Sequence, residues 1–575
     1  MLSGVPSKPT SALVAWSILI VTACVVYLSC LGSYMMLGSH EVVAAVPGRE
    51  MLHSGDWVVP RYGDVPRIRK PPLVYWLVAS SGWLFGEFSD FAVRFHSAIT
   101  ALGMVALMSL WATRWYGRTA GFCAAMVQTT SMWAVYYGRH VEIDMVMCLL
   151  TTTMMFLIAT QPAEESVSRT RWRWIGILTL IGLTWLAKFH YGAMMIFAPV
   201  AVWWGIQRQW RRWLDFVNPI GMLIAIACFA IWPYLMLREC PEALERWRFE
   251  TIGRATGEIG YDSWWYYGPE LLRLTLPWIG HALWAVPQSW QRAWKQGDER
   301  ERLLWIWLLV DLAIITLTPN KHSNYLLAAM PVMTLLTTQT FARGLASIHR
   351  GSVRFPKLAP SACLVAVAMG GIVLNLLAAK KWPAAQTGIL WITGVALVGM
   401  IVVGWNWQRR RWLVAGWGTL ASWMAILLIA LNLVAPAFDP RRDIADFSRQ
   451  LRREVLKGQP VCVFARGGAL PEFHPAVFYL DDPVFQVHSL SGLLQRVEQA
   501  GQLMAVIEPQ TLEKIREGDG HVAVEELALM PLQNEWRENP LVCVRLTNRL
   551  EGLQQAAHVD RDDVTATTFA SGKRR

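Results

Sequence analysis

The sequence predicts a polytopic α-helical membrane protein that carries a small α/β domain near its C-terminal end. Two observations lead to this fold class. Of 575 residues, 54% are hydrophobic and only 17% are charged, and the mean hydropathy is +0.30, which is too apolar for a soluble enzyme of several domains. After Pro436 the long apolar segments stop, and short β-rich runs alternate with helical stretches.

About thirteen apolar segments are long enough to cross a hydrocarbon core about 30 Å thick. They lie near residues 12–34, 90–113, 118–137, 141–160, 173–188, 190–206, 213–236, 268–287, 303–318, 323–345, 358–379, 386–405 and 411–435. The first segment is long and lacks a small-residue cleavage site, so we expect a retained helix and not a removed signal peptide. The 32 tryptophans gather near the ends of these segments, as in an interfacial belt.

Cations occupy every second connection between these segments, which by the positive-inside rule places those connections in the cytoplasm. They are Arg114 with Arg118, Arg169 to Arg173, Arg208 to Arg212, Arg292 to Arg302, Arg350 to Lys357, and Arg409 to Arg411. An odd number of spans then places the N-terminus in the cytoplasm and the C-terminus outside. These loops account for the net charge of +11, so the charge is no argument for a nucleic-acid partner.

The remaining connections face outward and hold most of the chemically interesting side chains. They are His40 to Lys70, Arg139 to Asp144, Lys188, Glu239 to Tyr267, and Lys321 to Tyr325. Charged groups at the mouth of a membrane protein often mark a functional site. Their shared sidedness predicts that one outward-facing cavity gathers them.

Each of these groups also has a purely structural interpretation. Lys188 and Lys321 lie near span ends and could snorkel to the membrane interface. Asp144 could form a structural ion pair with Arg139, and Glu41 could be a carboxylate that stabilises the start of a helix. These alternatives stay open at the level of sequence.

The predicted domains are a transmembrane domain at 1–436, which holds the candidate site residues, an extracytoplasmic α/β domain at 437–551 and a loose tail at 552–575. Strands are predicted at 460–465, 476–480, 503–508 and 541–546, with a helix at LSGLLQRVEQAG. The outer domain shows no P-loop and no metal-ligand spacing. Cys462 and Cys543 lie in predicted strands and could form a disulfide only if those strands are neighbours.

Several motifs along the first 440 residues carry a family resemblance. They are REMLHSGDWVVPRYGDVPRIRKPPLVYWL (49–77), FAVRFHSA (91–98), GRHVEIDM (138–145), LAKFHYG (186–192), WWYYGPELLRLTLPW (264–278) and NKHSNYLLAAMP (320–331). In this order they resemble the bacterial protein-mannosyltransferase-like membrane glycosyltransferases, and most closely the relatives of the aminoarabinose transferase that modifies lipid A. The resemblance implies the GT-C architecture, with juxtamembrane helices in the first outer loop and a C-terminal domain outside the membrane.

The resemblance also implies roles for individual residues. The family's first-loop acidic pair falls on His40 and Glu41, Lys70 matches the contact to the donor phosphate, Asp144 matches the second-loop acid, and Tyr325 matches the tyrosine after the lysine-containing loop. The sequence departs from the family at two positions. Relatives usually show Asp-Glu where this chain has His40-Glu41, and the transferase shows Glu-Lys-Pro where this chain has Arg69-Lys70-Pro71. A divalent metal ion is the cofactor that the resemblance leaves open.

Such enzymes take a sugar from a polyprenyl phosphate and pass it to an acceptor outside the cytoplasmic membrane, which here could be lipid A, a glycan, another lipid or a protein. The reaction needs cations for the phosphate and a base for the acceptor hydroxyl. The candidate phosphate-binding residues are Lys70, Arg69, Lys188, Lys321 and Tyr325. Glu41 is the candidate base, with His40 as the alternative, and Asp144 would orient one of these groups or the acceptor. A one-step displacement would invert the anomeric centre.

Two other functional classes stay open. A transporter or flippase of lipid-linked sugar would also need outward cations, and Asp311 within an apolar segment is the residue that favours it. A non-catalytic relative that binds lipid-linked sugar is favoured by the departures at His40 and Arg69. Turnover that depends on Glu41 would exclude this last class.

Overall fold

The computed structural model describes residues 9–33, 38–63, 65–162, 164–253, 256–258, 260–349, 359–381, 383–409, 411–437, 442–456, 459–464, 473–480, 484–487, 489–518, 521–529 and 541–548. The chain divides into two compact units. The first comprises Met1–Tyr34, Met51–Pro60 and Arg67–Phe438, and the second comprises Met35–Glu50, Arg61–Pro66 and Asp439–Arg575. The predicted tail at 552–575 lies outside the described residues.

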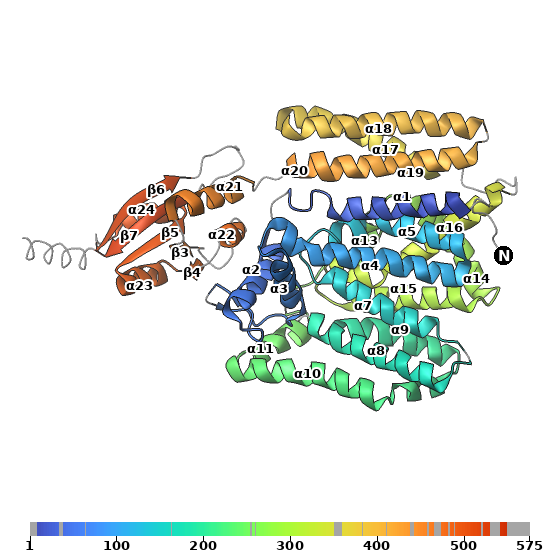
Figure 1. Ribbon diagram of the computed structural model, residues 1–575, viewed down its shortest axis with the longest axis horizontal. Coiled ribbons are helices and arrows are strands. Elements are labelled where there is room, and N and C mark those ends of the chain that lie inside the picture. The colour runs from blue at the N-terminus through green and yellow to red at the C-terminus, as the bar shows by residue number, and fades with distance from the viewer. Residues whose placement is uncertain are drawn as a thin grey trace, which may run out of the picture. The chain divides into compact units, whose positions relative to one another are not determined.

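The first unit is a bundle of helices that run side by side (Figure 1). Its α-helices are α1 (Pro9–Leu28), α3 (Leu73–Phe85), α4 (Asp90–Tyr116), α5 (Arg118–Thr130), α6 (Met132–Tyr137), α7 (Asp144–Ala159), α8 (Val167–Lys188), α9 (Tyr191–Ile206), α10 (Pro219–Glu239), α11 (Ala243–Arg248), α13 (Tyr267–Leu274), α14 (Ile279–Trp294), α15 (Glu299–Leu317), α16 (Met330–His349), α17 (Ala359–Lys381), α18 (Pro383–Gln408), α19 (Trp412–Ile429) and α20 (Ala435–Ala437). Four short helices of other types interrupt or extend them: η1 (Trp210–Phe216), η2 (Phe249–Gly253), η3 (Ser323–Ala328) and η4 (Ala430–Val434).

Within the described residues, four helical segments are long and apolar enough to cross a membrane by length and composition. They are Asp90–Tyr116, Pro219–Glu239, Pro383–Gln408 and Trp417–Ala437. Several other predicted spans form shorter apolar helices, such as α7 and α9. The predicted span at 118–137 is divided between α5 and α6 at Ser131. The total of thirteen spans therefore stays a prediction.

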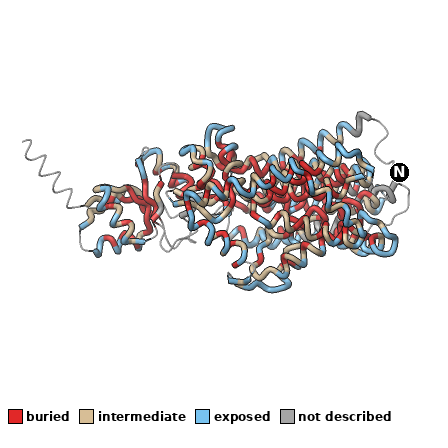
Figure 2. Tube along the Cα trace, turned by 90° about the horizontal axis from the view of Figure 1, so that it is seen from below, coloured by how far each residue is buried: buried red, intermediate tan, exposed pale blue. Residues whose placement is uncertain are grey.

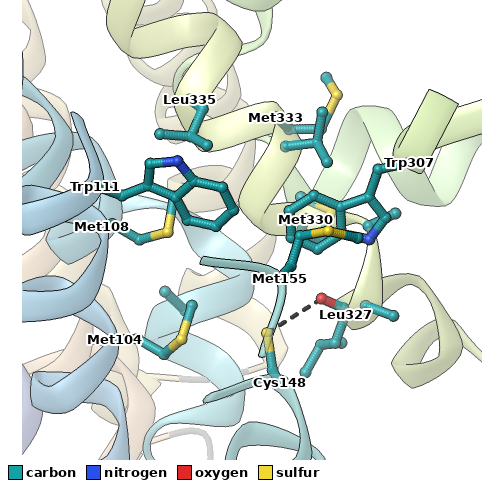
Figure 3. Close-up of a cluster of buried hydrophobic side chains, with 14 of the residues drawn as sticks. Met104, Met108, Trp111, Cys148, Met155, Trp307, Leu327, Met330, Met333 and Leu335 are labelled. Atoms are coloured by element: carbon teal, nitrogen blue, oxygen red, sulfur yellow. Dashed lines mark hydrogen bonds between the residues drawn. The ribbon is translucent and has the colours of Figure 1, made fainter. Parts of the chain in front are cut away.

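Sulfur-containing and aromatic side chains fill the centre of the bundle. Most residues there are coloured as buried in Figure 2. Trp111 of α4 stacks on Trp307 of α15 with ring centroids 5.9 Å apart. Beside them the Cys148 thiol donates a hydrogen bond to the Leu327 carbonyl at 3.2 Å, and methionines occupy the gaps (Figure 3). Flexible methionines suit such an irregular interior. This packing fixes α7 against η3, which matters because both elements carry site residues.

Glycines allow α8 and α10 to approach closely. A Cβ atom at Gly182 would lie 2.9 Å from the Cys228 side chain, and one at Gly221 would lie 2.7 Å from Leu178 Cδ1. Small residues at helix contacts are the usual means of close packing in membrane proteins. The contact holds the C-terminal end of α8, where Lys188 lies, against α10.

The second unit contains a five-stranded sheet with the order β4-β3-β5-β7-β6. Its strands are β3 (Val461–Phe464), β4 (Val484–Val487), β5 (Gln502–Ile507), β6 (Val522–Leu529) and β7 (Val542–Asn548). The helices that follow the bundle in the sequence are α21 (Arg442–Gln450), η5 (Leu451–Leu456), α22 (Phe473–Tyr479), α23 (Leu490–Ala500) and α24 (Pro509–Glu517). β3 pairs in parallel with β4 and β5, whereas β7 pairs antiparallel with β5 and β6.

The sheet corrects one expectation from the sequence and decides one question that the sequence left open. The predicted strand at 476–480 falls largely within α22, because a short apolar run buried on all sides can equally be a helix. Cys462 and Cys543 are free thiols, and β5 separates their strands. Two strand spacings amount to about 9.6 Å, beyond the reach of a disulfide. The predicted helix at LSGLLQRVEQAG is confirmed as α23.

The second unit also includes α2 (Gly38–Ser54) as far as Glu50, and the hairpin of β1 (Arg61–Tyr62) and β2 (Val65–Pro66). Arg49 of α2 is fully buried, and its guanidinium donates to the Phe478 carbonyl at 2.9 Å and to the Val477 carbonyl at 3.5 Å. Charge-assisted bonds to backbone oxygen are the usual way to satisfy a buried arginine. The helix that carries His40 and Glu41 is thereby tied to α22.

Candidate functional site

An ion pair between Asp144 and Lys188 forms the centre of the candidate site. Lys188 Nζ lies 2.7 Å from Asp144 Oδ1, and the two side chains are only 13% and 9% exposed. Asp144 is the first residue of α7, and Lys188 is the last residue of α8. These are the helix ends at which a carboxylate and an ammonium group are each favoured by the helix dipole. The two helix ends therefore hold both charges in place.

Residues from η3 and α9 surround this pair. The Asn324 amide donates to Asp144 Oδ2 at 3.1 Å. Lys188 Nζ lies 5.1 Å from the ring centroid of Tyr191 and 4.9 Å from that of Tyr325. The Tyr191 hydroxyl donates to the Tyr325 carbonyl at 2.8 Å, which fixes the two rings relative to each other. The result is a cation held between a carboxylate and two aromatic faces.

A second charged cluster joins the first outer loop to α11 and η2. Arg69 Nε lies 2.9 Å from Glu250 Oε1, Arg246 Nη2 lies 3.0 Å from the same oxygen, and Lys70 Nζ lies 3.8 Å from Glu250 Oε2. The Glu250 side chain is 2% exposed, whereas those of the three cations are one third to nearly one half exposed. One buried carboxylate thus pairs with three cations whose side chains are partly exposed at the surface.

Tryptophan side chains anchor the loop that presents Arg69 and Lys70. Trp247 Nε1 donates to the Ile68 carbonyl at 2.7 Å, and Trp232 Nε1 donates to the Val58 carbonyl at 2.9 Å. The Trp247 ring also contacts Phe189, with centroids 5.6 Å apart. Because Phe189 follows Lys188 directly, this contact connects the two charged clusters through one apolar layer.

Lys321 lies in a different setting. Its ammonium group donates to the carbonyls of Thr318 at 2.8 Å and of Asp262 and Pro319 at 3.4 Å each, and its side chain is nearly buried. Its backbone N–H donates to Asp262 Oδ2 at 2.8 Å. In this structure the lysine holds the turn before η3 together. Its contact with a phosphate stays a prediction.

The candidate base residues belong to the second unit. His40 and Glu41 lie in the first turn of α2, where His40 is exposed and Glu41 is only 1% exposed. The position of Glu41 is the one that the helix-start alternative predicts. The Glu41 side chain is buried, whereas the sequence places it among outward-facing groups that line an open cavity. The roles of both residues stay predictions.

The structure decides one alternative for Asp144. The Arg139 guanidinium donates to the carbonyls of Val26 at 2.5 Å and Ser29 at 2.8 Å, both in the α1 region. Asp144 instead pairs with Lys188. The snorkelling alternative for Lys188 is also wrong, because its ammonium is enclosed by Asp144 and two rings.

The structure adds residues that sequence reasoning missed: Asn324, Tyr191, Arg246, Glu250 and Asp262. Arg246 and Glu250 are four residues apart, which is the spacing of an ion pair on one helical turn, and this was the available signal. Among the described residues, no three His, Cys, Asp or Glu side chains gather in a way that could hold a metal ion. The described part of the chain therefore offers no ligand set that fits the divalent metal left open by the sequence.

Comparisons with known proteins place this geometry in context. Residues 69–235 match the family described as dolichyl-phosphate-mannose-protein mannosyltransferase. The undecaprenyl phosphate-alpha-4-amino-4-deoxy-L-arabinose arabinosyl transferase of Erwinia tasmaniensis is 27% identical over 405 residues, which cover 66% of this chain and 71% of that protein. The transferase of the same name from Serratia proteamaculans is 26% identical over 425 residues, covering 70% and 74%.

Solved structures show the same relation at the level of the fold. The crystal structure of ArnT from Cupriavidus metallidurans bound to undecaprenyl phosphate matches with a TM-score of 0.74 at 19% identity, covering 93% of this chain and 98% of that one. Its apo state matches with a TM-score of 0.71. The predicted resemblance to the mannosyltransferase-like and aminoarabinose-transferase-like family is confirmed, and so is the helical GT-C fold.

Proposed function

We propose that this chain is an integral membrane glycosyltransferase of the GT-C class, which moves a sugar from a polyprenyl phosphate to an acceptor outside the cytoplasmic membrane. The observation that carries the proposal is the match to the mannosyltransferase family over residues 69–235. That range contains Arg69, Lys70, Asp144 and Lys188, which belong to the two charged clusters. The chemistry of this donor requires such cations.

The donor already carries its leaving group, because the sugar is bonded to a phosphate. Departure of polyprenyl phosphate leaves negative charge on phosphate oxygens, which cations in a water-poor site stabilise strongly. Lys70 and Arg69 present partly exposed cationic heads at the end of an anchored loop. They are therefore the phosphate contacts that the geometry favours, with Lys188 and Tyr325 as the more enclosed pair beside them.

The acceptor hydroxyl must lose a proton as it attacks the anomeric carbon, and one-step displacement inverts that centre. Glu41 is the proposed base, and His40 is the alternative because imidazole titrates near neutral pH. Asp144 accepts from Lys188 and Asn324 through its two oxygens, so it is held rigidly. Its proposed role is to orient the acceptor or the lysine. No step is assigned to a metal ion.

The acceptor is the least defined part of the reaction. The relatives are named as arabinosyl transferases that use an undecaprenyl phosphate sugar, which supports an undecaprenyl carrier for the donor of this chain. Lipid A is the acceptor that the family resemblance favours, with a glycan, another lipid or a protein as alternatives. The proposed orientation has a cytoplasmic N-terminus, and the active site and C-terminal domain face the periplasm. A reporter fused after Arg575 should mark the outer side.

The decisive experiment compares wild-type membranes with a Glu41→Gln variant. Each is incubated with a panel of undecaprenyl phosphate sugars and candidate acceptors, and release of free undecaprenyl phosphate is measured. We expect release with one sugar in the wild type and at least a hundredfold less in Glu41→Gln, because general-base catalysis contributes about 10² to 10⁴ in rate. Glu498→Gln is the matched control, since Glu498 is exposed on α23 in the same unit.

The other outcomes separate the alternative functions. Release that persists in Glu41→Gln would remove Glu41 from the base role while keeping the enzyme class. Binding of undecaprenyl phosphate without turnover of any sugar would favour the non-catalytic relative. Movement of the intact lipid-linked sugar across vesicles would favour a flippase, for which the buried Asp311, bonded to Trp307 Nε1 at 3.0 Å, is the mid-helix carboxylate to test.

A further inference from the structure

Glu250 is a buried carboxylate that pairs with cations from two separate segments of the chain. Its Oε1 atom accepts from Arg69 Nε at 2.9 Å and from Arg246 Nη2 at 3.0 Å, while Lys70 Nζ lies 3.8 Å from Oε2. Arg69 and Lys70 come from the first outer loop, and Arg246 comes from α11. One oxygen atom therefore aligns two guanidinium groups that are 177 residues apart in the chain.

The four charges do not cancel. Three cations and one carboxylate leave a formal charge of about +2, the charge that complements a phosphate monoester released as a leaving group. The exposures point the same way. Glu250 is 2% exposed, but Arg69 is 45%, Lys70 is 38% and Arg246 is 33% exposed. The negative charge lies beneath the surface, and the excess positive charge lies at the surface.

A buried carboxylate does not need three cations to be paired. Burying a carboxylate is costly unless it is paired, and one well-placed arginine can already supply bidentate pairing. Here each arginine contacts Glu250 through a single nitrogen, and a guanidinium has five N–H donors. The arrangement holds both arginine planes in place through one edge while their heads stay partly exposed.

The backbone around the cluster is also fixed. Trp247, the residue after Arg246, donates from Nε1 to the carbonyl of Ile68, the residue before Arg69. Trp247 is buried in an apolar layer with Val59, Leu186 and Phe189. The two segments that carry the cations are therefore joined by a direct hydrogen bond and by packing, so that their spacing is set before any ligand arrives.

We propose that Arg246 is a further phosphate-binding residue for the lipid donor, beside Lys70 and Arg69, and that Glu250 is a positioning residue that aligns Arg69 and Arg246. This inference deepens the proposed function and rests on it for the identity of the lipid. Glu250 does not touch the donor. It acts by holding two guanidinium groups on one oxygen atom despite their mutual repulsion.

The test measures equilibrium binding of undecaprenyl phosphate to the purified full-length protein in nanodiscs, which requires no turnover. Arg246→Met should weaken binding about tenfold, corresponding to one lost charge-assisted contact of about 1.4 kcal/mol. Arg248→Met is the matched control, because Arg248 is exposed on the same helix and the substitution removes the same charge. We expect the control to change binding less than twofold.

Two further variants test the positioning role of Glu250. Glu250→Gln keeps the shape but removes the charge that aligns the arginines, and it should raise the donor KM about tenfold while leaving the acceptor KM unchanged. Glu250→Asp keeps the charge and should recover part of the donor affinity. A merely structural residue would instead lower thermal stability and the yield of folded protein without this split between donor and acceptor.

The outcomes distinguish this inference from the proposed function. Equal binding by Arg246→Met and Arg248→Met would refute the phosphate contact, even if the wild type transfers sugar. Binding of undecaprenyl phosphate that depends on Arg246, in a protein that turns over no sugar, would support the contact and contradict the enzymatic proposal. An unchanged donor KM in a folded Glu250→Gln variant would refute the positioning role.

Discussion

Replacing Lys188 by methionine should strongly destabilise the bundle, because it leaves the Asp144 carboxylate without its ammonium partner. Methionine matches the length of the lysine stem and keeps the apolar contacts. The carboxylate is 9% exposed and lies 2.7 Å from the lysine nitrogen, so water cannot easily replace the lost charge. Methionine also removes the cation from between the rings of Tyr191 and Tyr325.

The magnitude follows from the geometry. Two unit charges 2.7 Å apart attract each other by about 6 kcal/mol at an effective dielectric constant of 20, before the cost of desolvation is subtracted. Breaking a buried pair by removing one partner typically costs about 3 to 5 kcal/mol. We expect a loss of about 3 kcal/mol in the free energy of unfolding for Lys188→Met. Asp144→Asn combined with Lys188→Met should be less harmful than the sum of the single changes by about 2 kcal/mol.

The assay is a double-mutant cycle of unfolding in detergent micelles titrated with dodecyl sulfate and followed by tryptophan fluorescence. The exposed pair of Glu270 and Arg273, 2.6 Å apart with side chains 22% and 47% exposed, supplies the control cycle. Its coupling should stay below about 1 kcal/mol. An unchanged free energy of unfolding in Lys188→Met, or losses from the two single changes that simply add in the double variant, would refute the enclosed ion pair. The snorkelling interpretation of Lys188 would then be favoured.

Three other predictions concern the supports of the site and the outer domain. Trp247→Phe should lower donor affinity several-fold, measured as donor KM, because it removes the hydrogen bond to the Ile68 carbonyl and reduces the ring that packs on Phe189. Gly221→Val should destabilise the bundle by about 2 kcal/mol in the same unfolding assay, because an added Cβ atom would lie 2.7 Å from Leu178 Cδ1. At an open helix surface the same change should be neutral or slightly stabilising, because valine has a higher helix propensity than glycine. Burial raises the pKa of the Cys543 thiol to about 12, so at pH 8 only about one thiol in ten thousand is ionised. Alkylation of Cys543 in the native protein should therefore be slow, and its rate should rise about tenfold per pH unit. Rapid labelling at pH 8 would contradict this burial.

Much of the helical architecture could be predicted from sequence, because long apolar segments have few alternatives in a membrane. The predicted strands at 460–465, 503–508 and 541–546 correspond to β3, β5 and β7, which are buried. The strands β4 and β6 were missed. β6 lies at the sheet edge and its burial does not alternate, so it lacks the period-two pattern on which strand prediction depends.

The part of the candidate site that could be predicted consists of residues that the predicted topology places on the outer side of the membrane. Asp144, Lys188 and Tyr325 were selected for their shared outward position, and the structure brings these three together. Sequence could not show that the Tyr325 ring lies against the Lys188 ammonium group, nor that Asn324 donates a hydrogen bond to Asp144. Those facts depend on how η3 folds back onto α7, which is a tertiary contact without a local signal.

The departure at Arg69 has a different meaning in three dimensions than in the sequence. In the sequence, the chain has an arginine where the family pattern Glu-Lys-Pro has a carboxylate, which suggests a lost function. In the structure, Glu250 Oε1 lies 2.9 Å from Arg69 Nε, and Glu250 Oε2 lies 3.8 Å from Lys70 Nζ. A carboxylate therefore lies beside Lys70, but it comes from η2 and also forms an ion pair with Arg246. Because Glu250 supplies a carboxylate beside Lys70 although residue 69 is an arginine, this departure is weak evidence for a non-catalytic relative, and His40 becomes the position on which that alternative depends.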